Sequence, residues 1–356
     1  EEVARIIGHL SNLKARRLMN LVQIYSEGKY DVAHTWQDYC NIYGGIAALI
    51  SGVSRIVMSA RTLPPPQKGR LAARQGRSYR ECYRLLLESN DVLLTHNSDF
   101  GKMEYIEWLD VPENRNVTVH NGLDVSKWIM KTEYEFNLKS EIEIDQNCMV
   151  IGYVGRFTTD KRPWLFLKVA ERILGATNDS ESLELSEWFS DNEEGDRDLL
   201  LEEIVWDNSK EVHFVMVGDG PQFDKSREIV QNSEILRGRV HFVGFSEKVG
   251  EYMRNFDCLL LTSRVEGLPN VIIEAQACGV PVVATNAGGS RECIIEGQTG
   301  IIAYDDSPSK IGELLKEVLS DKEYAKNANK KGVKFVKKKF GYKAYSKNVN
   351  KLYSGV

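Results

Sequence analysis

The sequence alternates short runs of apolar, often β-branched residues with longer amphipathic stretches along almost its whole length. This alternation predicts an α/β fold, because strands separated by helices join side by side as parallel sheets whose faces the helices cover. The expected strands span residues 30–36, 55–60, 91–96 and 116–120, followed by 148–155, 212–218, 239–245, 257–263, 281–285 and 300–303. The expected helices span residues 1–27, 39–50, 70–89, 98–109, 163–175, 222–233, 270–279, 308–320, 322–338 and 341–353.

The length of 356 residues favours two domains, because each half is long enough to bury its own core. We predict a first domain at 1–145, with a polar linker near 127–147, and a second domain at 148–338. The last residues, 339–356, are expected to form a helix that packs back on the first domain. The first domain has fewer strands than the ~5–6 of a typical sheet, so we expect one or more N-terminal βα units to be absent from this chain.

Charge is distributed unevenly behind a net value of −5. Residues 179–211 hold thirteen Asp and Glu against two basic residues, a local net of −11. An acidic insertion at 178–210 is therefore expected inside the second domain, between a helix and a strand. It contains the D-x-D pair Asp196 and Asp198. Metal-dependent sugar-nucleotide enzymes of another fold hold a divalent ion with such a pair. No strand precedes this pair, so a solvated run of charge is favoured over a metal site.

Basic residues gather at 61–84, where seven Lys and Arg face the single acid Glu81. Five arginines recur every three or four residues along the expected helix: Arg70, Arg74, Arg77, Arg80 and Arg84. Such a stripe is either a solvated helix face or a surface for an anionic membrane or an anionic acceptor. Nucleic acid is disfavoured as a partner, because aromatic residues for base stacking are sparse in this stretch.

The composition excludes several classes of protein. Hydrophobic residues make up 42% of the chain and charged residues 27%, as in an ordinary globular protein. No apolar run approaches the ~18 residues of a transmembrane helix, and no signal peptide opens the chain. We therefore expect a cytoplasmic protein, with peripheral contact at the inner face of the cytoplasmic membrane through 61–84. The cysteines form no C-x-x-C pair and the histidines no H-x-x-x-H pair, so no zinc site is expected.

The first candidate for chemistry is "YVGRFTTDK", residues 153–161. An expected strand runs into Gly155, whose missing side chain lets a ligand approach the backbone. Arg156 and Lys161 follow before Pro163 opens a helix. Two cations beside a helix N-terminus suit a diphosphate. The alternative is an arginine and a lysine on the surface of an ordinary βα loop.

Two further strands end in glycine turns, "VMVGDGPQF" at 215–223 and "VHFVGF" at 240–245. The first lacks the complete G-x-G-x-x-G spacing of a dinucleotide-binding loop, so a nicotinamide cofactor is disfavoured and a tight turn explains its glycines equally well. The second places Val243, Gly244 and Phe245 at the carboxyl end of a strand, where open α/β sheets bind ligands. Main-chain groups there are able to contact a flat base; a plain core strand is the alternative.

The stretch "EGLPNVIIEA", residues 266–275, holds two glutamates eight positions apart. Glu266 follows an expected strand, and a helix is expected to begin near Pro269 or Asn270. The free amides of a helix start suit a phosphate or sugar hydroxyls. Glu274 lies on an otherwise apolar helix, where a carboxylate is costly to bury unless it is paired or hydrogen-bonded. A ligand contact is therefore favoured over a solvent-facing position.

Taken in order, these stretches resemble the retaining glycosyltransferases of family 4. The matching motifs are "DVAH" (31–34), "TVHNGLD" (118–124), "GYVGRF" with Asp160 and Lys161 (152–161), "VGDGP" (217–221), "HFVGF" (241–245), the pair Glu266 and Glu274, and "ACGVPVVATNAGG" (277–289). The resemblance runs from about Asp31 to the C-terminus and points to bacterial surface-polysaccharide or glycolipid enzymes. It implies the GT-B fold, in which two Rossmann-like doubly wound domains face a cleft, with the N-terminal domain incomplete in this chain.

The resemblance also implies a site for a nucleotide diphosphate sugar. Arg156 and Lys161 would neutralise the diphosphate, and Glu274 would accept hydrogen bonds from the ribose hydroxyls. Glu266 would contact the donor sugar, so the implied catalytic residues are Glu266, Arg156 and Lys161. The other implied donor-binding positions are Gly155, Val243, Gly244, Phe245, Gly267, Leu268, Pro269 and Asn270.

Two residues, Arg61 and Asn121, are assigned to the acceptor or sugar side. The family often presents a histidine after the strand at 55–60, where this sequence has Arg61 instead. An arginine pairs well with a carboxylate. We therefore raise the hypothesis of an acidic sugar, a uronic acid.

The implied reaction moves a sugar from a UDP-sugar to a glycan or lipid-linked acceptor, with retention of configuration and without a metal or other cofactor. Arg156 and Lys161 would stabilise the departing diphosphate in place of a metal. Two alternatives stay open. One is a sugar-nucleotide epimerase of the same fold, and the other is a non-enzymatic scaffold that binds an anionic surface through 61–84. The sequence does not indicate an oligomeric state.

Overall fold

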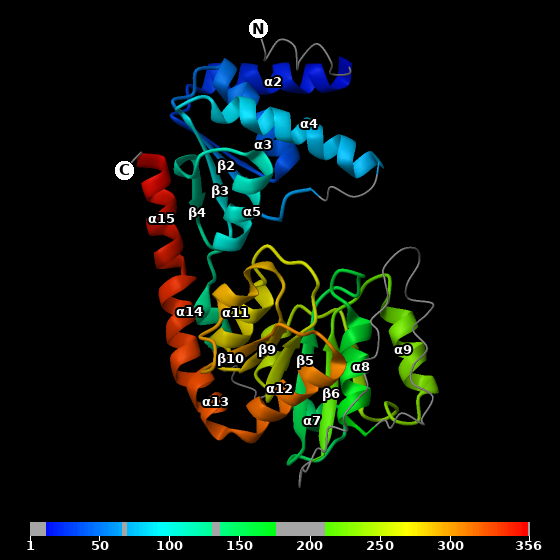
Figure 1. Ribbon diagram of the computed structural model, residues 1–356. Helices are drawn as coiled ribbons and strands as arrows, with labels where there is room; N and C mark the ends of the chain where they lie inside the picture. The colour runs from blue at the N-terminus through cyan, green and yellow to red at the C-terminus, as the bar shows by residue number, and fades with distance from the viewer. Residues whose placement is uncertain (1–11, 66–69, 130–135, 176–210, 355–356) are drawn as a thin grey trace. The chain divides into compact units, whose positions relative to one another are not determined.

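The computed structural model describes residues 12–65, 70–129, 136–175 and 211–354 (Figure 1). The chain divides into two compact units. Unit 1 comprises Glu1–Gly122, Glu266–Leu268 and Tyr342–Val356, and unit 2 comprises Leu123–Val265 and Pro269–Gly341. Each unit contains its own parallel sheet, which confirms the predicted α/β class with two parallel-sheet domains.

Unit 1 contains a four-stranded parallel sheet of order β1-β2-β3-β4. Its strands are β1 (Val32–Trp36), β2 (Arg55–Ala60), β3 (Val92–His96) and β4 (Asn116–Thr118). Its helices are α2 (Asn12–Gly28), α3 (Asp38–Ile50), α4 (Arg70–Leu87), α5 (Asp99–Leu109), the 3-10 turn η1 (Glu113–Arg115) and α15 (Tyr342–Ser354). All four expected strands are present, because each β-branched run is bounded by turn residues that end it.

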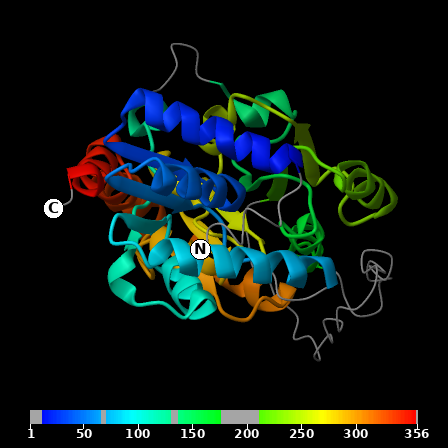
Figure 2. The same cartoon turned by 90° about the horizontal axis from the view of Figure 1, so that it is seen from above.

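The two faces of this sheet bury different residues, because side chains alternate between the faces along a strand. Ile56 and Met58 of β2 are fully buried in a cluster that includes Ile46 of α3. Val57, between them, is buried in a separate cluster with Leu352 of α15. Figure 2 shows α3 between α2 and α4 on the first of these faces.

Unit 2 contains a six-stranded parallel sheet of order β10-β9-β8-β5-β6-β7. Its strands are β5 (Met149–Val154), β6 (Val212–Val217), β7 (Val240–Gly244), β8 (Cys258–Leu261), β9 (Val282–Thr285) and β10 (Gly300–Ala303). Its helices are α6 (Val125–Ile129), α7 (Leu138–Glu141), α8 (Pro163–Ile173), α9 (Phe223–Asn232), α10 (Val249–Met253), α11 (Asn270–Ala277), η3 (Gly288–Cys293), α12 (Pro308–Ser320), α13 (Lys322–Asn327), the π-turn η4 (Ala328–Gly332) and α14 (Val333–Lys339). This strand order is that of a doubly wound Rossmann-like sheet.

The core of unit 2 lies between the sheet and the helices α8 and α12, which run side by side over one of its faces (Figure 1). Phe166 of α8, Phe214 of β6 and Leu315 of α12 are fully buried in one cluster. Phe166 and Phe214 meet edge to face with ring centroids 5.8 Å apart. The largely apolar strands are those expected of a parallel sheet covered on both faces.

The structure corrects the predicted domain boundary. The first continuous segment of unit 1 ends at Gly122 rather than near residue 145, and the described residues of the predicted linker, 127–129 and 136–147, belong to unit 2. The reason is a set of hydrogen bonds that only the tertiary structure creates. Arg254 donates to the main-chain oxygen of Trp128 at 3.1 Å, and the main-chain nitrogen of Leu138 donates to Asn255 Oδ1 at 3.2 Å.

The other end of the chain also differs from the predicted bounds. Unit 2 extends to Gly341 rather than to 338, because Leu123 forms an isolated β-bridge with Gly341. Residues from Tyr342 onward belong to unit 1. There, the Arg55 side chain donates to the main-chain oxygen of Leu352 at 2.8 Å.

Several predicted features fall outside the described residues. They include the acidic insertion at 178–210 with Asp196 and Asp198, and part of the predicted linker, residues 130–135. The side chains of Arg70 and Arg74 also lie outside the description. Within the described ranges, no helix combines the length and the apolar character needed to cross a bilayer.

Candidate functional site

The strand order of unit 2 places a topological switch point between β5 and β8. These strands are neighbours in the sheet, with Ile151 paired to Cys258 and Gly152 to Leu259. The chain leaves β5 toward β6 on one side and leaves β8 toward β9 on the other. Loops that diverge in this way leave a crevice at the carboxyl ends of the strands, which is where doubly wound sheets bind ligands. The predicted motifs that follow β5 and β8 therefore meet at one edge of the sheet.

The loop between β5 and α8 carries the predicted cations in a defined main-chain conformation. Tyr153 donates its hydroxyl proton to the main-chain oxygen of Arg156 at 3.0 Å, while the Arg156 side chain is exposed. The main-chain nitrogen of Lys161 donates to Thr158 at 3.0 Å, and Pro163 occupies the first turn of α8. The loop thus presents Arg156 and Lys161 from fixed main-chain positions.

The glycines of "VGDGP" support this loop from the neighbouring strand end. Gly218 and Gly220 have φ values of 137° and 152°, which side-chain-bearing residues rarely adopt. A Cβ atom on Gly218 would lie 1.9 Å from the main-chain oxygen of Gly155, and one on Gly220 would lie 2.7 Å from that of Phe157. Phe157 also donates its main-chain N–H to Asp219 at 2.9 Å. The tight turn expected from sequence is therefore a direct support for the loop after β5.

Arg162 joins the two loops of the switch point, and the sequence motifs did not reveal it. Its Nε donates to the main-chain oxygen of Thr262 at 2.7 Å, and its Nη1 lies 2.5 Å from a carboxylate oxygen of Asp306. In return, the Thr262 hydroxyl donates to the main-chain oxygen of Lys161 at 2.9 Å. No local pattern signals this role, because the partners of Arg162 are 100 and 144 positions away in the sequence.

The segment after β8 contains the predicted pair Glu266 and Glu274. Residues Glu266–Leu268 belong to unit 1, although they were predicted in the second domain. The helix α11 then begins at Asn270, with Pro269 as its N-cap and no side-chain hydrogen bond to the cap. Glu274 lies one turn inside α11, as predicted.

Glu274 has a pKa that is shifted far from its ordinary value, which is a common property of functional residues. Its carboxyl group is largely buried, and burial raises its pKa from the ordinary 4.5 to about 7. Within the described part of the chain, no hydrogen bond or ion pair to this side chain is formed. A buried carboxylate is costly unless a partner binds it, so this position is poised for a ligand that donates hydrogen bonds.

The raised pKa of Glu274 predicts how stability varies with pH. The unfolded chain loses this proton near pH 4.5 and the folded chain only near pH 7, so stability falls as the pH rises between these values. Glu274→Gln, which stays neutral, should equal the wild type at pH 4.5. Above pH 7 it should gain about 3 kcal/mol, since each tenfold change in proton affinity is worth about 1.4 kcal/mol. Urea denaturation between pH 4.5 and 8 measures this difference; a difference that does not change with pH contradicts it.

The predicted base-contacting segment lies at the free edge of the same sheet. Gly244 ends β7 with a φ of 79° and accepts a hydrogen bond from the Gly218 main-chain nitrogen at 2.8 Å. Phe245 follows, and 76% of its side chain is exposed. Val243 to Phe245 therefore adjoin the turn that supports the loop with Arg156, and the loops after β5, β6 and β7 line up in strand order.

Unit 1 contains the two residues assigned to the sugar or acceptor side. Arg61 directly follows β2 and Asn121 lies in the loop after β4, so both are at carboxyl ends of parallel strands. The Arg61 guanidinium donates a hydrogen bond to Asn121 Oδ1. The Asn97 amide donates to the main-chain oxygen of Arg61 at 3.1 Å. The structure thus brings together the two residues that the sequence assigned separately.

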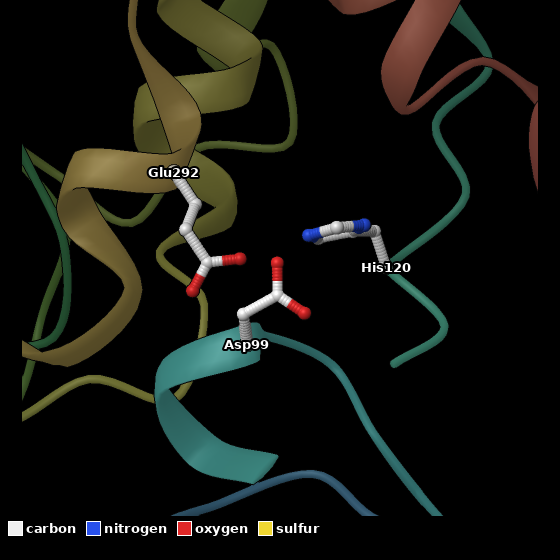
Figure 3. Close-up of side chains that lie close together, drawn as sticks. All are labelled: Asp99, His120 and Glu292. Carbon is white, nitrogen blue, oxygen red and sulfur yellow. The ribbon is translucent and has the colours of Figure 1, made fainter. Parts of the chain in front are cut away.

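A carboxylate and an imidazole lie close together in the same unit. Figure 3 shows Asp99 at the start of α5 and His120 on the segment after β4; Glu292, also drawn there, belongs to η3 of unit 2. The Thr118 hydroxyl donates to Asp99 at 2.5 Å, and an Asp99 oxygen and a His120 ring nitrogen are at most 4.8 Å apart. Two groups of unit 1 fall short of the three or four protein ligands of a zinc site, and we derive no metal step from them.

Comparisons with known proteins agree with this geometry. The chain is 31% identical over 310 residues to the Vi polysaccharide biosynthesis protein VipC/TviE of Salmonella typhi, which covers 85% of this chain and 47% of that protein. It is 25% identical over 323 residues to the UDP-Gal:alpha-D-GlcNAc-diphosphoundecaprenol alpha-1,3-galactosyltransferase of Escherichia coli, covering 90% and 74% of the two chains. This chain thus spans about half the length of the first of these relatives.

Among solved structures, Anabaena Alr3699/HepE in complex with UDP superposes with a TM-score of 0.75 at 18% identity, covering 95% of this chain and 82% of that one. Such a likeness establishes the fold. The two parallel-sheet units define the GT-B class of glycosyltransferase folds, as the sequence motifs predicted. Residues 198–335 match the family described as "Glycosyl transferases group 1". This part of the chain therefore carries a glycosyl transferases group 1 domain.

Proposed function

We propose that this chain is a glycosyltransferase that moves a sugar from a nucleotide diphosphate sugar to a glycan or lipid-linked acceptor. The observation that carries the proposal is Glu274, a largely buried carboxylate without a protein partner in the described chain, one turn into the helix that follows the switch point. The two vicinal hydroxyls of a ribose are hydrogen-bond donors of the kind that such a carboxylate accepts. The relatives named in polysaccharide and lipid-linked glycan assembly support the acceptor class.

The predicted residues of the donor site have distinct parts in the proposed reaction. Arg156 and Lys161 bind the diphosphate and stabilise the negative charge that it gains as the bond to the sugar breaks. Val243 to Phe245 contact the base through main-chain groups. Glu266 contacts the sugar, with the main-chain amides of Gly267 to Asn270 beside it. Arg162 acts through the others, because its bonds to Thr262 and Asp306 hold the two loops together.

The finer parts of the proposal are a UDP-sugar as donor, retention of anomeric configuration, no metal requirement, and a uronic acid as one of the sugars. HepE, a structural neighbour, was solved with UDP, which supports UDP among the nucleotides. Two cations in the loop after β5 provide the charge that a metal ion supplies in other enzymes. The uronic acid rests on Arg61. Peripheral contact with an anionic membrane surface through 61–84 remains part of the proposal.

The proposal has a direct binding test. Isothermal titration of the protein with UDP, GDP and ADP should give the tightest binding with UDP, and Glu274→Gln should weaken that binding about tenfold, the value of a charge-assisted hydrogen bond. Glu228→Gln, an exposed glutamate of α9, is the matched control and should bind as the wild type does. Equal affinities of the Glu274 variant and the wild type contradict the ribose assignment.

Product analysis with the best donor distinguishes the alternatives. Sugar transfer that needs an acceptor and survives EDTA supports the metal-independent transferase. Isomerisation of the donor without an acceptor supports the epimerase of the same fold. Failure of every nucleotide to bind, with retained binding to anionic vesicles, supports the non-enzymatic scaffold.

A further inference from the structure

Arg61 is a cation of unit 1 that lacks an anionic partner in the described chain. Burial lowers its pKa below the usual range, and the ionisable group that acts on its charge is the phenol of Tyr345, which is neutral at neutral pH. The guanidinium has five N–H groups, and Asn121 accepts a hydrogen bond from one of them. A partly buried guanidinium that has no carboxylate partner is suited to an anionic ligand.

Aromatic residues hold this guanidinium in place. The Cζ atom of Arg61 lies 4.9 Å from the ring centroid of Trp36. Trp36 in turn stacks on His34, with centroids 4.6 Å apart and planes at 21°. Both ring nitrogens of His34 are hydrogen-bonded, Nδ1 to the Tyr353 hydroxyl at 2.7 Å and Nε2 to the Ser59 hydroxyl at 2.8 Å. A cation supported in this way is oriented before a ligand arrives, which lowers the entropic cost of binding.

The residue after Trp36 has a strained backbone. Gln37 adopts φ 69° and ψ 155°, a region that is almost exclusive to glycine, and its side chain is exposed. Its main chain is held on both sides, since its nitrogen donates to the Ser59 oxygen at 2.8 Å and its oxygen accepts from the Asn41 nitrogen at 2.8 Å. Strain in a non-glycine residue clusters at ligand sites, where the surrounding structure maintains it. Nothing in the packing of α3 requires an amide side chain at this exposed position.

These residues lie at the carboxyl ends of three strands of one parallel sheet. Trp36 ends β1 and Gln37 follows it, Arg61 follows β2, and Asn121 lies after β4. We propose that Arg61, Gln37 and Asn121, with Trp36 supporting the guanidinium, form a subsite of unit 1 for a sugar that bears a carboxylate. This inference rests on the proposed transferase function and deepens it. A single guanidinium matches the single charge and the planar shape of a carboxylate, and the two side-chain amides are donors and acceptors for sugar hydroxyls.

The carboxylate belongs either to the donor sugar or to the acceptor, and titration separates the two sources. The donor arm compares UDP-glucuronic acid with UDP-glucose. The acceptor arm compares a glucuronic-acid-containing oligosaccharide with its neutral, carboxyl-reduced form, without nucleotide. In one of the two arms, the wild type should bind the acidic ligand about tenfold more tightly than the neutral ligand. Arg61→Ala should abolish that preference. Arg17→Ala, an exposed arginine of α2, is the control and should leave the preference unchanged.

The outcomes are distinct. A preference that Arg61→Ala abolishes in the donor arm assigns the acid to the donor sugar, and one abolished in the acceptor arm assigns it to the acceptor. The inference is overturned if the wild type shows no preference for the acidic ligand in either arm. It is also overturned if Arg61→Ala lowers the affinity for the acidic and the neutral ligand equally. Binding of UDP alone is measured in parallel. If UDP does not bind, the proposed function is refuted, but the acceptor arm still tests the subsite because it uses no nucleotide.

Gln37→Gly tests the strained position separately. Glycine adopts this backbone without strain, so the melting temperature should stay equal to the wild type or rise. Affinity for the acidic ligand should nevertheless fall about threefold or more, because an amide hydrogen bond is lost. A stable variant with unchanged affinity overturns the place of Gln37 in the subsite.

Discussion

Gly218→Ala should destabilise unit 2 by about 3 kcal/mol or more, an effect at the upper end of single substitutions. An added Cβ would lie 1.9 Å from the main-chain oxygen of Gly155, and a main-chain atom cannot move aside as a flexible side chain does. The φ of 137° adds backbone strain for any residue with a side chain. Thermal and urea denaturation, followed by circular dichroism, measure the loss.

Gly238→Ala is the matched control for this result. Gly238 also has a positive φ, 77°, but a Cβ there meets nothing within 4 Å. Its substitution should therefore cost only the strain of the left-handed backbone, about 1–2 kcal/mol. Equal losses of stability in the two variants would show that the contact of Gly218 with the loop after β5 contributes nothing to stability. The motif "VGDGP" would then not support the site.

Lys161→Ala should lower the transfer rate about 100-fold, the effect of removing one group that stabilises charge in a transition state. The main chain of Lys161 is fixed at the switch point, since its nitrogen donates to Thr158 and its oxygen accepts from the Thr262 hydroxyl. Removal of the ammonium group therefore leaves the loop in place and takes away one positive charge. Turnover with the donor identified by titration measures the effect.

Lys168→Ala is the matched control, because Lys168 lies in α8, close in sequence to Lys161, but is not a residue of the proposed site. Its rate should remain near that of the wild type. Lys161→Arg should recover part of the lost rate, because it restores the charge with a different geometry. A Lys161→Ala variant that folds and turns over at a near-normal rate would refute contact with the leaving diphosphate.

Most elements of the fold could be predicted from sequence because their signals are local. A strand such as β2 is recognised by its own β-branched and apolar residues, and a helix such as α12 by its period and by Pro308 at its start. The order of the motifs predicted which strand ends carry Arg156 and Glu274. The boundary between the units was wrong for the opposite reason. A polar segment resembles a linker in the sequence, and contacts that form only in the tertiary structure, among them the bonds of Arg254 and Asn255, attach it to unit 2.

By itself, the sequence determined the alternation of strands and helices and the residues at the ends of the strands, because both depend on neighbours within a few positions. The tertiary structure alone decided how those ends are used. Arg162 joins two loops 100 residues apart, Glu274 has a raised pKa because burial denies it water, and Arg61 rests on Trp36 without an anionic partner in the described chain. Such properties arise where distant segments exclude solvent from one another, and that exclusion depends on the order of strands in the sheets rather than on any local pattern.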